Sequence, residues 1–588
     1  MILQELVHYY DRKACDPDPA KRLPSLGFED KDIPFVIELT SDGRVVQLRD
    51  TRSLDGKKPR AQSFLVPQGG KKTSGVAANL LWDRAAYAIG AERARKGNAE
   101  ITPHAAFRAR IAALPATAQA DAGVQAVLAA IDRADWSALH TNVAWGEICE
   151  TNPVMTFQLS GDVDLVCQRP AVVAASRPAA AADAAMGMCL IEGVHAPIQR
   201  LHSSIKGVWG AQSSGANIVS FNARAFESYG KTESQGENAP VGERAAFAYT
   251  TALNHLLAQG SRNRVQVGDA STVFWADKPT QFDGEFTLAD FFGENKDDPD
   301  RGVRAVQALH QAMASGRLPA SDQDTQFFVL GLAPNAARIS VRFWLRAPLA
   351  ELAPRILQHF ADLAVVRRYD NDPVTPSLFR LLASVALLGK LDNVPPRLAG
   401  EWMRAILEGQ PYPATLLNAA VMRCKAEQEV TTLRAAVLKA WLNRDHRRRH
   451  GDVAPSHQHF KEELDMLQTD APYLLGRLFA VLERIQQQAQ PGINATIRDR
   501  YYGGASTTPV LVFTTLLRLK NAHLKKLSDG QTGNFERLIG EIMQPITEFP
   551  RQLTLPQQAT FALGYYHQRQ TFYARKQEGH VDEPTQEI

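Results

Sequence analysis

The chain has 588 residues, of which 45% are hydrophobic and 22% charged, so it has the composition of an ordinary folded protein and is too long for one hydrophobic core. Its 66 basic and 63 acidic residues leave a net charge of +3, so any affinity for nucleic acid must come from local clusters and not from a basic whole. Five scattered cysteines make a poor disulfide framework and no apolar run is long enough to span a membrane, so we expect a soluble, cytoplasmic protein.

The first part of the chain is predicted to mix helix and strand. Apolar residues at helical spacing favour a helix over residues 3–10, and the apolar runs around the turn at residues 41–43 favour a hairpin over residues 35–48. The glycine-flanked segment 69–75 is predicted to be a loop, and the pattern of residues 79–89 suits a helix directly after it. The alanine-rich segment 171–185 indicates a connector, although its composition also permits a helix.

The second part is predicted to be helical. Strand signals end with a pair at residues 327–332 and 338–344, and from Leu349 onward apolar residues recur at helical intervals. The charged segment 443–455 is predicted to interrupt the helices as a basic linker, and a helix restarts near Leu474. The fold class is therefore α+β, with a mixed α/β N-terminal region followed by an all-α C-terminal helical bundle. The expected domains are residues 1–170, 186–348, 349–445 and 459–588.

The loop at residues 69–75 is the first candidate binding element. Lys71, Lys72, Thr73 and Ser74 resemble the tail of a phosphate-binding loop, but the required Gly-Lys-[Ser/Thr] ending is absent, so a nucleotide triphosphatase is rejected. Two adjacent lysines beside glycines can instead grip a DNA phosphate or reach into a minor groove. A solvated surface loop remains the alternative.

The segment from Gln212 to Gly230 is the second candidate, because it gathers amides, hydroxyls and glycines around one short apolar strand. Its donors and acceptors suit phosphates or base edges, and no acid/base pair accompanies them, so binding is favoured over catalysis. They are Gln212, Ser213, Ser214, Asn217, Ser220 and Asn222. On local chemistry alone, a polar turn with a satisfied hydrogen-bond network fits equally well.

Two basic stretches lie further along. The run Arg444, Arg447, Arg448 and Arg449 is interpreted as part of a solvated linker. Residues 471–576 hold 13 basic and 6 acidic residues, which is a local footprint for nucleic acid. The cations in its middle are Arg498, Arg500, Arg518, Lys520, Lys525 and Lys526. The adjacent Tyr501 and Tyr502 suit stacking on unpaired bases and suit a core equally well.

The sequence contains no convincing motif for a metal-binding or catalytic site. Cys167, Cys189, His195 and His202 share one region, but their spacing does not fit a zinc knuckle, so no metal is expected. Ser203-Ser-Ile-Lys206 and Ser228-Tyr-Gly-Lys231 match Ser-x-x-Lys, a pattern common by chance, and the other serine-hydrolase motifs are missing. We therefore expect neither a catalytic residue nor a cofactor.

Several long strings resemble the large subunit of type I-C CRISPR surveillance (Cascade) complexes, the Csd large-subunit family. They are residues 1–6 (MILQEL), 77–83 (AANLLWD), 212–254 and 473–483 (YLLGRLFAVLE). The strings run from the first residue to near the last, so the resemblance covers essentially the whole chain.

The resemblance implies a non-catalytic subunit that serves antiviral defence. Such a subunit recognises the protospacer-adjacent motif in double-stranded target DNA, promotes R-loop formation, holds the displaced strand and helps recruit a separate helicase-nuclease. Its implied partners are the crRNA, the backbone and crRNA-processing subunits and a small subunit. In the family a small subunit arises from an internal start, for which Met466 and Met422 are candidates.

The resemblance also implies roles for particular residues. Motif contact is carried by loops of the N-terminal part in the family, which implicates Lys71, Lys72, Thr73, Ser74 and Asn79. The polar segment with Gln212, Ser213, Ser214, Asn217 and Asn222 is a second candidate for the DNA fork, and which loop reads bases stays open. The basic bundle is implicated in displaced-strand binding. Two other functions remain open, a purely structural assembly subunit and an unrecognised nucleic-acid hydrolase.

Overall fold

The structure is a computed structural model in which the chain forms two compact units. Unit 1 comprises Met1–Ser203 and Val219–Leu253, and unit 2 comprises Ser204–Ile218 and Asn254–Ile588. The described residues are 2–18, 21–55, 58–69, 76–91, 102–176, 185–221, 223–228, 231, 235–278, 288–293, 301–314, 324–395, 397–451, 454 and 457–573. The four domains expected from the sequence stay a prediction.

Unit 1 is built on a four-stranded mixed sheet of order β3-β2-β8-β7, in which β2 and β8 are parallel and the outer pairs antiparallel. Its two central strands are almost wholly buried, as strands covered on both faces must be. The strands of this sheet are β2 (Phe35–Leu39), β3 (Val45–Asp50), β7 (Trp82–Arg84) and β8 (Val154–Leu159). The predicted hairpin over residues 35–48 is confirmed by the pairing of β2 with β3.

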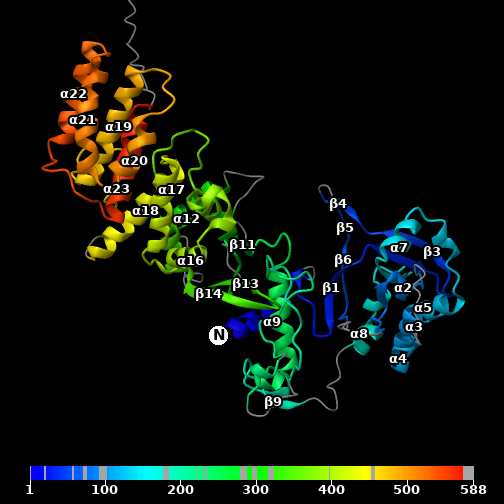
Figure 1. Ribbon diagram of the computed structural model, residues 1–588. Coiled ribbons are helices and arrows are strands. Elements are labelled where there is room, and N and C mark those ends of the chain that lie inside the picture. Colours follow the sequence, from blue (N-terminus) through cyan, green and yellow to red (C-terminus); the bar gives the residue numbers. More distant parts are fainter. Residues whose placement is uncertain are drawn as a thin grey trace, which may run out of the picture. The chain divides into compact units, whose positions relative to one another are not determined.

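Three two-stranded ladders and a set of helices complete unit 1. The ladder strands are β1 (Phe28–Asp32), β4 (Ser53–Asp55), β5 (Lys58–Arg60), β6 (Ser63–Pro67), β9 (Met186–Met188) and β10 (His195–Pro197). The helices are α1 (Ile2–Ala14), α2 (Ala85–Ala88), α3 (Pro103–Ala112), α4 (Ala116–Gln119), α5 (Ala122–Arg133), α6 (Ser137–His140), α7 (Trp145–Thr151), α8 (Pro170–Ser176) and α9 (Glu243–Leu256), with short 3-10 turns η2 (Val166–Gln168), η3 (Arg224–Phe226) and η4 (Gln235–Asn238). Figure 1 shows α3, α5 and α7 grouped around the sheet.

The predicted helix over residues 79–89 is wrong. Residues 82–84 form the edge strand β7, and only Ala85–Ala88 are helical. Leu81 has a positive φ of 62°, which breaks a helix, and Thr156 in β8 donates a hydrogen bond to its carbonyl. The indole of Trp82 donates to the Pro67 carbonyl at 2.8 Å. Pairing with a strand far along the chain therefore overrides the local pattern. Of the alanine-rich segment 171–185, the first six residues belong to α8 and residues 177–184 lie outside the described residues.

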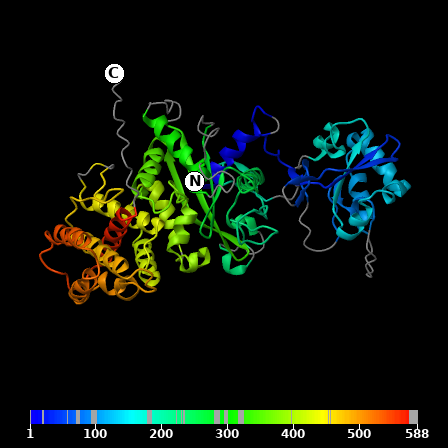
Figure 2. The same ribbon diagram turned by 90° about the horizontal axis from the view of Figure 1, so that it is seen from above.

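Unit 2 begins with an antiparallel meander of order β11-β12-β13-β14, which confirms the strand pair predicted at residues 327–332 and 338–344. The strands are β11 (Arg264–Val267), β12 (Ala270–Ala276), β13 (Gln326–Asn335) and β14 (Arg338–Pro348). Along β12 the side chains alternate, so Phe274 packs into the helical core while Ser271 and Trp275 point to the opposite face. Seen from above in Figure 2, yellow-green helices lie against the green strands.

The rest of unit 2 is helical, and the predicted order of a mixed α/β region followed by C-terminal helices is confirmed. The helices are α11 (Leu288–Phe292), α12 (Arg301–Ala314), α14 (Leu349–Leu363), α15 (Leu378–Val385), α16 (Leu398–Glu408), α17 (Ala414–Glu427), α18 (Thr432–Arg449), α19 (Ala471–Ala489), α20 (Ile497–Ala505), α21 (Pro509–Leu524), α22 (Asp529–Met543) and α23 (Leu555–Thr571), with 3-10 turns η5 (Leu387–Gly389) and η6 (Leu391–Asn393). Among the described residues, no helix is both long and apolar enough to cross a membrane.

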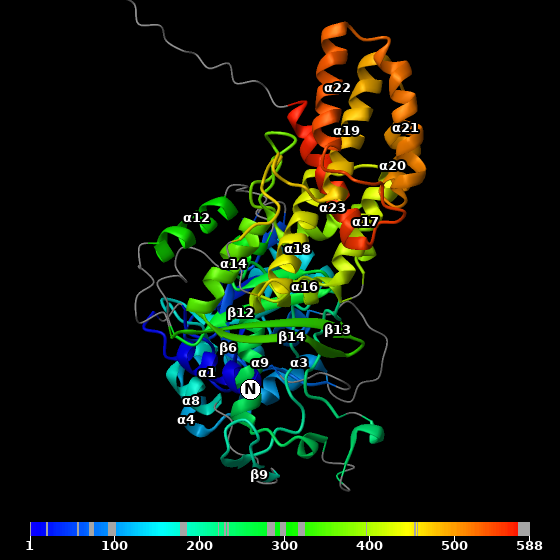
Figure 3. The same ribbon diagram turned by 90° about the vertical axis from the view of Figure 1, so that its left-hand side faces the viewer.

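The helices α19 to α23 pack as a bundle against α17 and α18, and α19, α21 and α22 run alongside one another in Figure 3. Helices α19 and α23 approach so closely that their backbones touch. A Cβ on Gly476 would lie 2.0 Å from the Phe561 carbonyl oxygen, and one on Gly564 would lie 2.1 Å from that of Tyr473. Glycine at these two positions is therefore what allows the helices to cross.

The predicted interruption of the helices over residues 443–455 is wrong for its first half. Helix α18 continues to Arg449, and Asn443, Arg444 and Asp445 are buried. Asn443 is held by a pair of hydrogen bonds with the backbone of Phe460, which explains why a polar residue can lie in the core there.

Candidate nucleic-acid interface

The polar segment around Gln212 begins as a loop fixed on the sheet of unit 2. Ile205 and Ala216 exchange backbone hydrogen bonds of 2.8 and 2.9 Å, which closes the loop at its base. The side chain of Asn254 binds the backbone at the start of the loop. It accepts a hydrogen bond from the Lys206 amide at 2.8 Å and donates one to the Ser204 carbonyl at 3.2 Å. The buried side chains of Ile205 and Ala216 anchor the loop on its inner side.

Two glycines make this loop possible. Gly207 has a φ of 84°, and a Cβ there would lie 2.6 Å from the Leu257 carbonyl oxygen. Gly215 has a φ of 90°, and a Cβ there would lie 2.8 Å from the Ile205 carbonyl oxygen. Both positions combine left-handed backbone with close approach, so only glycine fits without strain.

The loop ends in a tight turn that presents polar groups to solvent. The Gly215 amide donates to the Gln212 carbonyl at 2.9 Å, and Gln212, Ser213 and Ser214 are all exposed. Asn217 behind the turn is half-buried, and its carbonyl accepts from the Ile339 amide at 3.0 Å, which ties the loop to β14. The structure therefore brings together the first four of the six candidate residues. Ser220 is half-buried and belongs to unit 1, and Asn222 lies outside the described residues.

Trp209 was missed by the sequence analysis although it lies on this loop. Its side chain is 54% exposed, and its amide donates to the Ser271 hydroxyl at 2.9 Å. The signal that could have found it is the string Gly207-Val-Trp-Gly210, in which a large aromatic residue is flanked by glycines directly before the polar turn.

The other candidate loop belongs to unit 1. Lys71, Lys72, Thr73 and Ser74 lie outside the described residues. Asn79, assigned to the same role, is 9% exposed, and its amide donates to the Asp83 carboxylate at 2.9 Å. Its side-chain Oδ1 is buried without a hydrogen-bond partner among the described residues, close to Gly69. Asn79 thus lies below the surface at the described edge of this loop.

The basic residues of the C-terminal bundle divide into two groups. Lys520 pairs with Glu536 at 2.7 Å, and Arg498 lies 3.9 Å from the buried Glu483, so both cations are engaged within the bundle. The others are exposed and form no ion pair with a described residue: Arg500, Arg518, Lys525 and Lys526. Arg518 on α21 and Lys525, the residue directly after that helix, are two helical turns apart and therefore share one face. Tyr502 is a core residue, and Tyr501 packs partly against the core.

The arginine run at the end of α18 is not the solvated linker that we predicted. Asp362 is fully buried and accepts from Arg444 Nε at 2.9 Å and from Arg447 Nη2 at 2.6 Å. Only Arg448 and Arg449 remain exposed, and both pair with Asp445. The long-range partner Asp362 explains the difference, because it gives two guanidinium groups a buried carboxylate.

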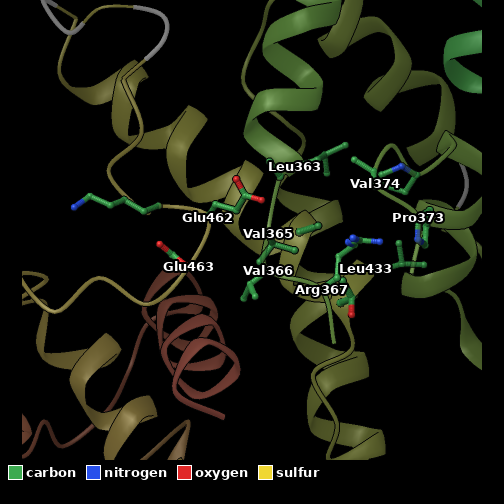
Figure 4. Close-up of a pocket in the computed structure, with 14 residues that line it drawn as sticks. Leu363, Val365, Val366, Arg367, Pro373, Val374, Leu433, Glu462 and Glu463 are labelled. Atoms are coloured by element: carbon green, nitrogen blue, oxygen red, sulfur yellow. The ribbon is translucent and has the colours of Figure 1, made fainter. Parts of the chain in front are cut away.

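A hollow of about 560 Å³ lies between the end of α14, the start of α18 and the segment before α19. Its wall is apolar on the side of Val365, Val366 and Leu433. Figure 4 shows Glu462 and Glu463 on the side opposite Val374. The lining also includes the cations Arg367 and Lys461, so its charges are mixed and give no preference for the phosphates of a nucleic acid.

The cysteines and histidines between residues 167 and 202, which we weighed as metal ligands, have separate roles in packing and hydrogen bonding. Cys167 and Cys189 are both buried, and burial raises the pKa of the Cys167 thiol to about 12. His202 shares a 2.5 Å hydrogen bond with the Tyr249 hydroxyl. Over the described ranges, no three histidine, cysteine or acidic side chains are arranged to hold a metal ion.

One comparison with known proteins gives a match. The family model described as CRISPR-associated protein (Cas_Csd1) matches residues 6–573, which is nearly the whole chain. The search of curated proteins gives no match to this chain.

Proposed function

Because the chain belongs to the Cas_Csd1 family of CRISPR-associated proteins, we propose that it is the large subunit of a type I-C Cascade and recognises the protospacer-adjacent motif in target DNA. The family makes it a member of a CRISPR effector complex, and the resemblance stated from the sequence strings is confirmed at this level. In such a complex, guide-RNA pairing reads most of the target sequence, and a protein subunit needs to read only a short flanking motif in the duplex.

The observation that carries the DNA-reading role is the exposed turn Gln212–Ser214 on an anchored loop. An amide and two hydroxyls present both donors and acceptors, which is what base edges and phosphates require. The glycines and the bonds to Asn254 and Ile339 hold the turn in place before DNA arrives, so little ordering entropy is lost on binding. Lys71 to Ser74 form the second candidate reader, supported by the family resemblance and by their charge.

For the displaced strand we propose the exposed cations of the bundle, Arg500, Arg518, Lys525 and Lys526. Their charges are available for a phosphate backbone because no described carboxylate neutralises them. Arg498 lies near the buried Glu483, and Lys520 pairs with the exposed Glu536, so the charges of these two cations are already engaged within the bundle.

We further propose that the subunit is not an enzyme and acts in the cytoplasm, and that a recruited helicase-nuclease cuts the DNA. The five free thiols suit a reducing compartment. The assembled complex without the nuclease is expected to leave labelled target DNA intact in the presence of Mg²⁺ or Mn²⁺. Metal-dependent cleavage that persists in the purified subunit would instead support the hydrolase alternative.

The test of motif recognition uses the complex assembled with its guide RNA and partner subunits. Binding to duplexes with the correct and a scrambled flanking motif is compared for the wild type, Gln212→Ala/Ser213→Ala/Ser214→Ala and Lys71→Ala/Lys72→Ala. Loss of a base-reading group is expected to cost about 1 to 3 kcal/mol on the correct motif and to relax discrimination. Asn534→Ala/Gln544→Ala, two exposed polar residues on and directly after α22, is the matched control and should behave as the wild type.

The structural-subunit alternative predicts a different result. If both loop variants keep full discrimination while the complex assembles, neither loop reads the motif. A charge-reversal variant of Arg518 and Lys525 that weakens assembly but not target binding would then favour a purely structural role.

A further inference from the structure

Trp209 is unusual among the tryptophans of this chain. All eight lie in the part of the chain that the structure describes, and of these Trp209 alone is exposed. The other tryptophans are buried or half-buried, and Trp275 on the neighbouring strand β12 is 1% exposed. With about half of its side chain exposed, Trp209 contributes less to folding than a buried tryptophan would, and its free surface is available for binding.

The backbone that carries Trp209 is held firmly. Its amide donates to the Ser271 hydroxyl, which in turn donates to Gln266 Oε1 at 3.1 Å. The two flanking glycines have φ values of 84° and 76°, and a Cβ on the second, Gly210, would touch Pro334 at 3.4 Å. The residue is therefore fixed between β11, β12 and the end of β13, on the sheet face opposite the helical core.

The surroundings of Trp209 in the chain suit a nucleic acid. Three residues further on, the exposed Gln212, Ser213 and Ser214 offer donors and acceptors, and Lys206 three residues before it is exposed and cationic. Aromatic rings beside cations and amides are the combination that binds unpaired bases, because every base has a face that stacks.

We propose that Trp209 is the stacking platform for one unpaired nucleobase of the target DNA at the opened end of the duplex. The indole packs on the base while Gln212 to Ser214 contact its edge or the adjacent phosphate. This inference rests on the proposed function of the loop, which it deepens by naming a single-stranded base as the ligand.

The test uses the assembled complex and a target that carries 2-aminopurine at successive positions beside the motif. Stacking on the indole changes the fluorescence of the probe at one position, and Trp209→Ala is expected to abolish that change. Affinity for a target with a pre-opened bubble at this place should fall by roughly 5- to 150-fold. Trp209→Phe should restore part of both signals, whereas Trp209→Leu, which keeps the apolar volume without an aromatic face, should not.

The control is Leu467→Ala, which removes another exposed apolar side chain of unit 2 and should leave both readouts unchanged. If Trp209→Ala keeps wild-type affinity and fluorescence while the Gln212 to Ser214 variant loses motif discrimination, the stacking role is wrong and the proposed function survives. If Trp209→Ala instead prevents the subunit from joining the complex, the indole is an anchor for a protein and the inference is overturned.

Discussion

Asp362 shows how one buried residue can decide the structure of a charged segment. Its carboxylate is fully buried and accepts from Arg444, Arg447 and Gln358. The Lys439 ammonium donates to the Asp362 carbonyl at 3.0 Å, and burial lowers the pKa of Lys439 to about 8. Three cations thus lie around Asp362, the only carboxylate that accepts hydrogen bonds from both Arg444 and Arg447 among the described residues, so its negative charge is needed to stabilise them.

Replacing this carboxylate is expected to be costly. Asp362→Asn leaves the buried Arg444 and the largely buried Arg447 without this counter-charge, which should lower the free energy of unfolding by about 3 to 5 kcal/mol. The midpoint of chemical unfolding measures the change. Glu408→Gln removes the acid of a more exposed pair with Arg404 and should change stability by less than about 1 kcal/mol. Equal effects of the two variants would contradict the buried role of Asp362.

At the level of single residues, the sequence predicted which functional groups a segment carries better than it predicted their burial and their partners. The polar residues Gln212 to Ser214 do form an exposed turn, and their role in binding DNA stays a prediction. The sequence wrongly predicted that Arg444 and Arg447 are solvated, because their partner Asp362 lies more than 80 positions earlier in the chain. It missed Trp209, because an isolated tryptophan belongs by default in a core and only the structure shows its exposure.

At the level of elements, glycine has opposite effects on stability in two helices of the same bundle. In α19, Gly476 touches the backbone of α23 and makes the close crossing possible. In α22, a Cβ on Gly540 would meet nothing within 4 Å, so that glycine only weakens its helix.

These two glycines give a matched pair of variants with effects of opposite sign. Gly476→Ala should destabilise the protein by at least about 2 kcal/mol, because α19 and α23 must move apart. Gly540→Ala should stabilise it by about 0.5 to 1 kcal/mol through helix propensity. Thermal and chemical unfolding of both variants measure the difference, and a neutral Gly476→Ala would mean that the two helices are not in backbone contact.

Elements with a local signal were predictable from the sequence. The hairpin β2–β3, the pair β13–β14 and the helices from α14 onward follow from periodicity and turn residues. The failures came from long-range partners. Strand β7 pairs with β8 across many residues, and α18 continues through its charged end because Asp362 and Phe460 bind that end.

At the scale of the whole molecule, the buried His359 and His567 and the half-buried His446 should make stability depend on pH. Burial lowers the pKa of His567 from 6.5 to about 3 and that of His446 to about 4, and it places the pKa of His359 well below its usual value. Because these folded-state values are lowered, the unfolded chain takes up protons first. The contribution of these neutral histidines to the free energy of unfolding is therefore fully present above a pH of about 6.5 and is lost as the pH falls below it.

The expected loss can be tested at His567, which shares a 2.8 Å hydrogen bond with the Tyr473 hydroxyl. This histidine alone should cost roughly 2 kcal/mol of stability at about pH 5. Unfolding measured between neutral and mildly acidic pH should show a smaller decline for His567→Gln than for the wild type. An unchanged pH dependence in the variant would mean that His567 does not govern it.

Charge at this scale is nearly balanced, with a net value of +3, while residues 471–576 hold 13 basic and 6 acidic residues. Balanced overall charge limits non-specific attraction, so binding should depend on where the free cations lie. Arg500, Arg518, Lys525 and Lys526 are exposed, whereas Arg404 and Lys461 are exposed but already paired with Glu408 and Asp465.

The salt dependence of target binding separates these two sets of cations. If the first four contact phosphates of the displaced strand, each Ala variant should reduce the slope of log K against log salt by about 0.7, and the fourfold variant by roughly 3. Arg404→Ala/Lys461→Ala should leave the slope unchanged, because paired cations release few counterions on binding. If the slope instead falls by the same amount per charge removed in the two variants, the bundle attracts DNA only through the general field of the complex. A specific contact depends on where a charge lies, whereas a general field depends only on how much charge there is.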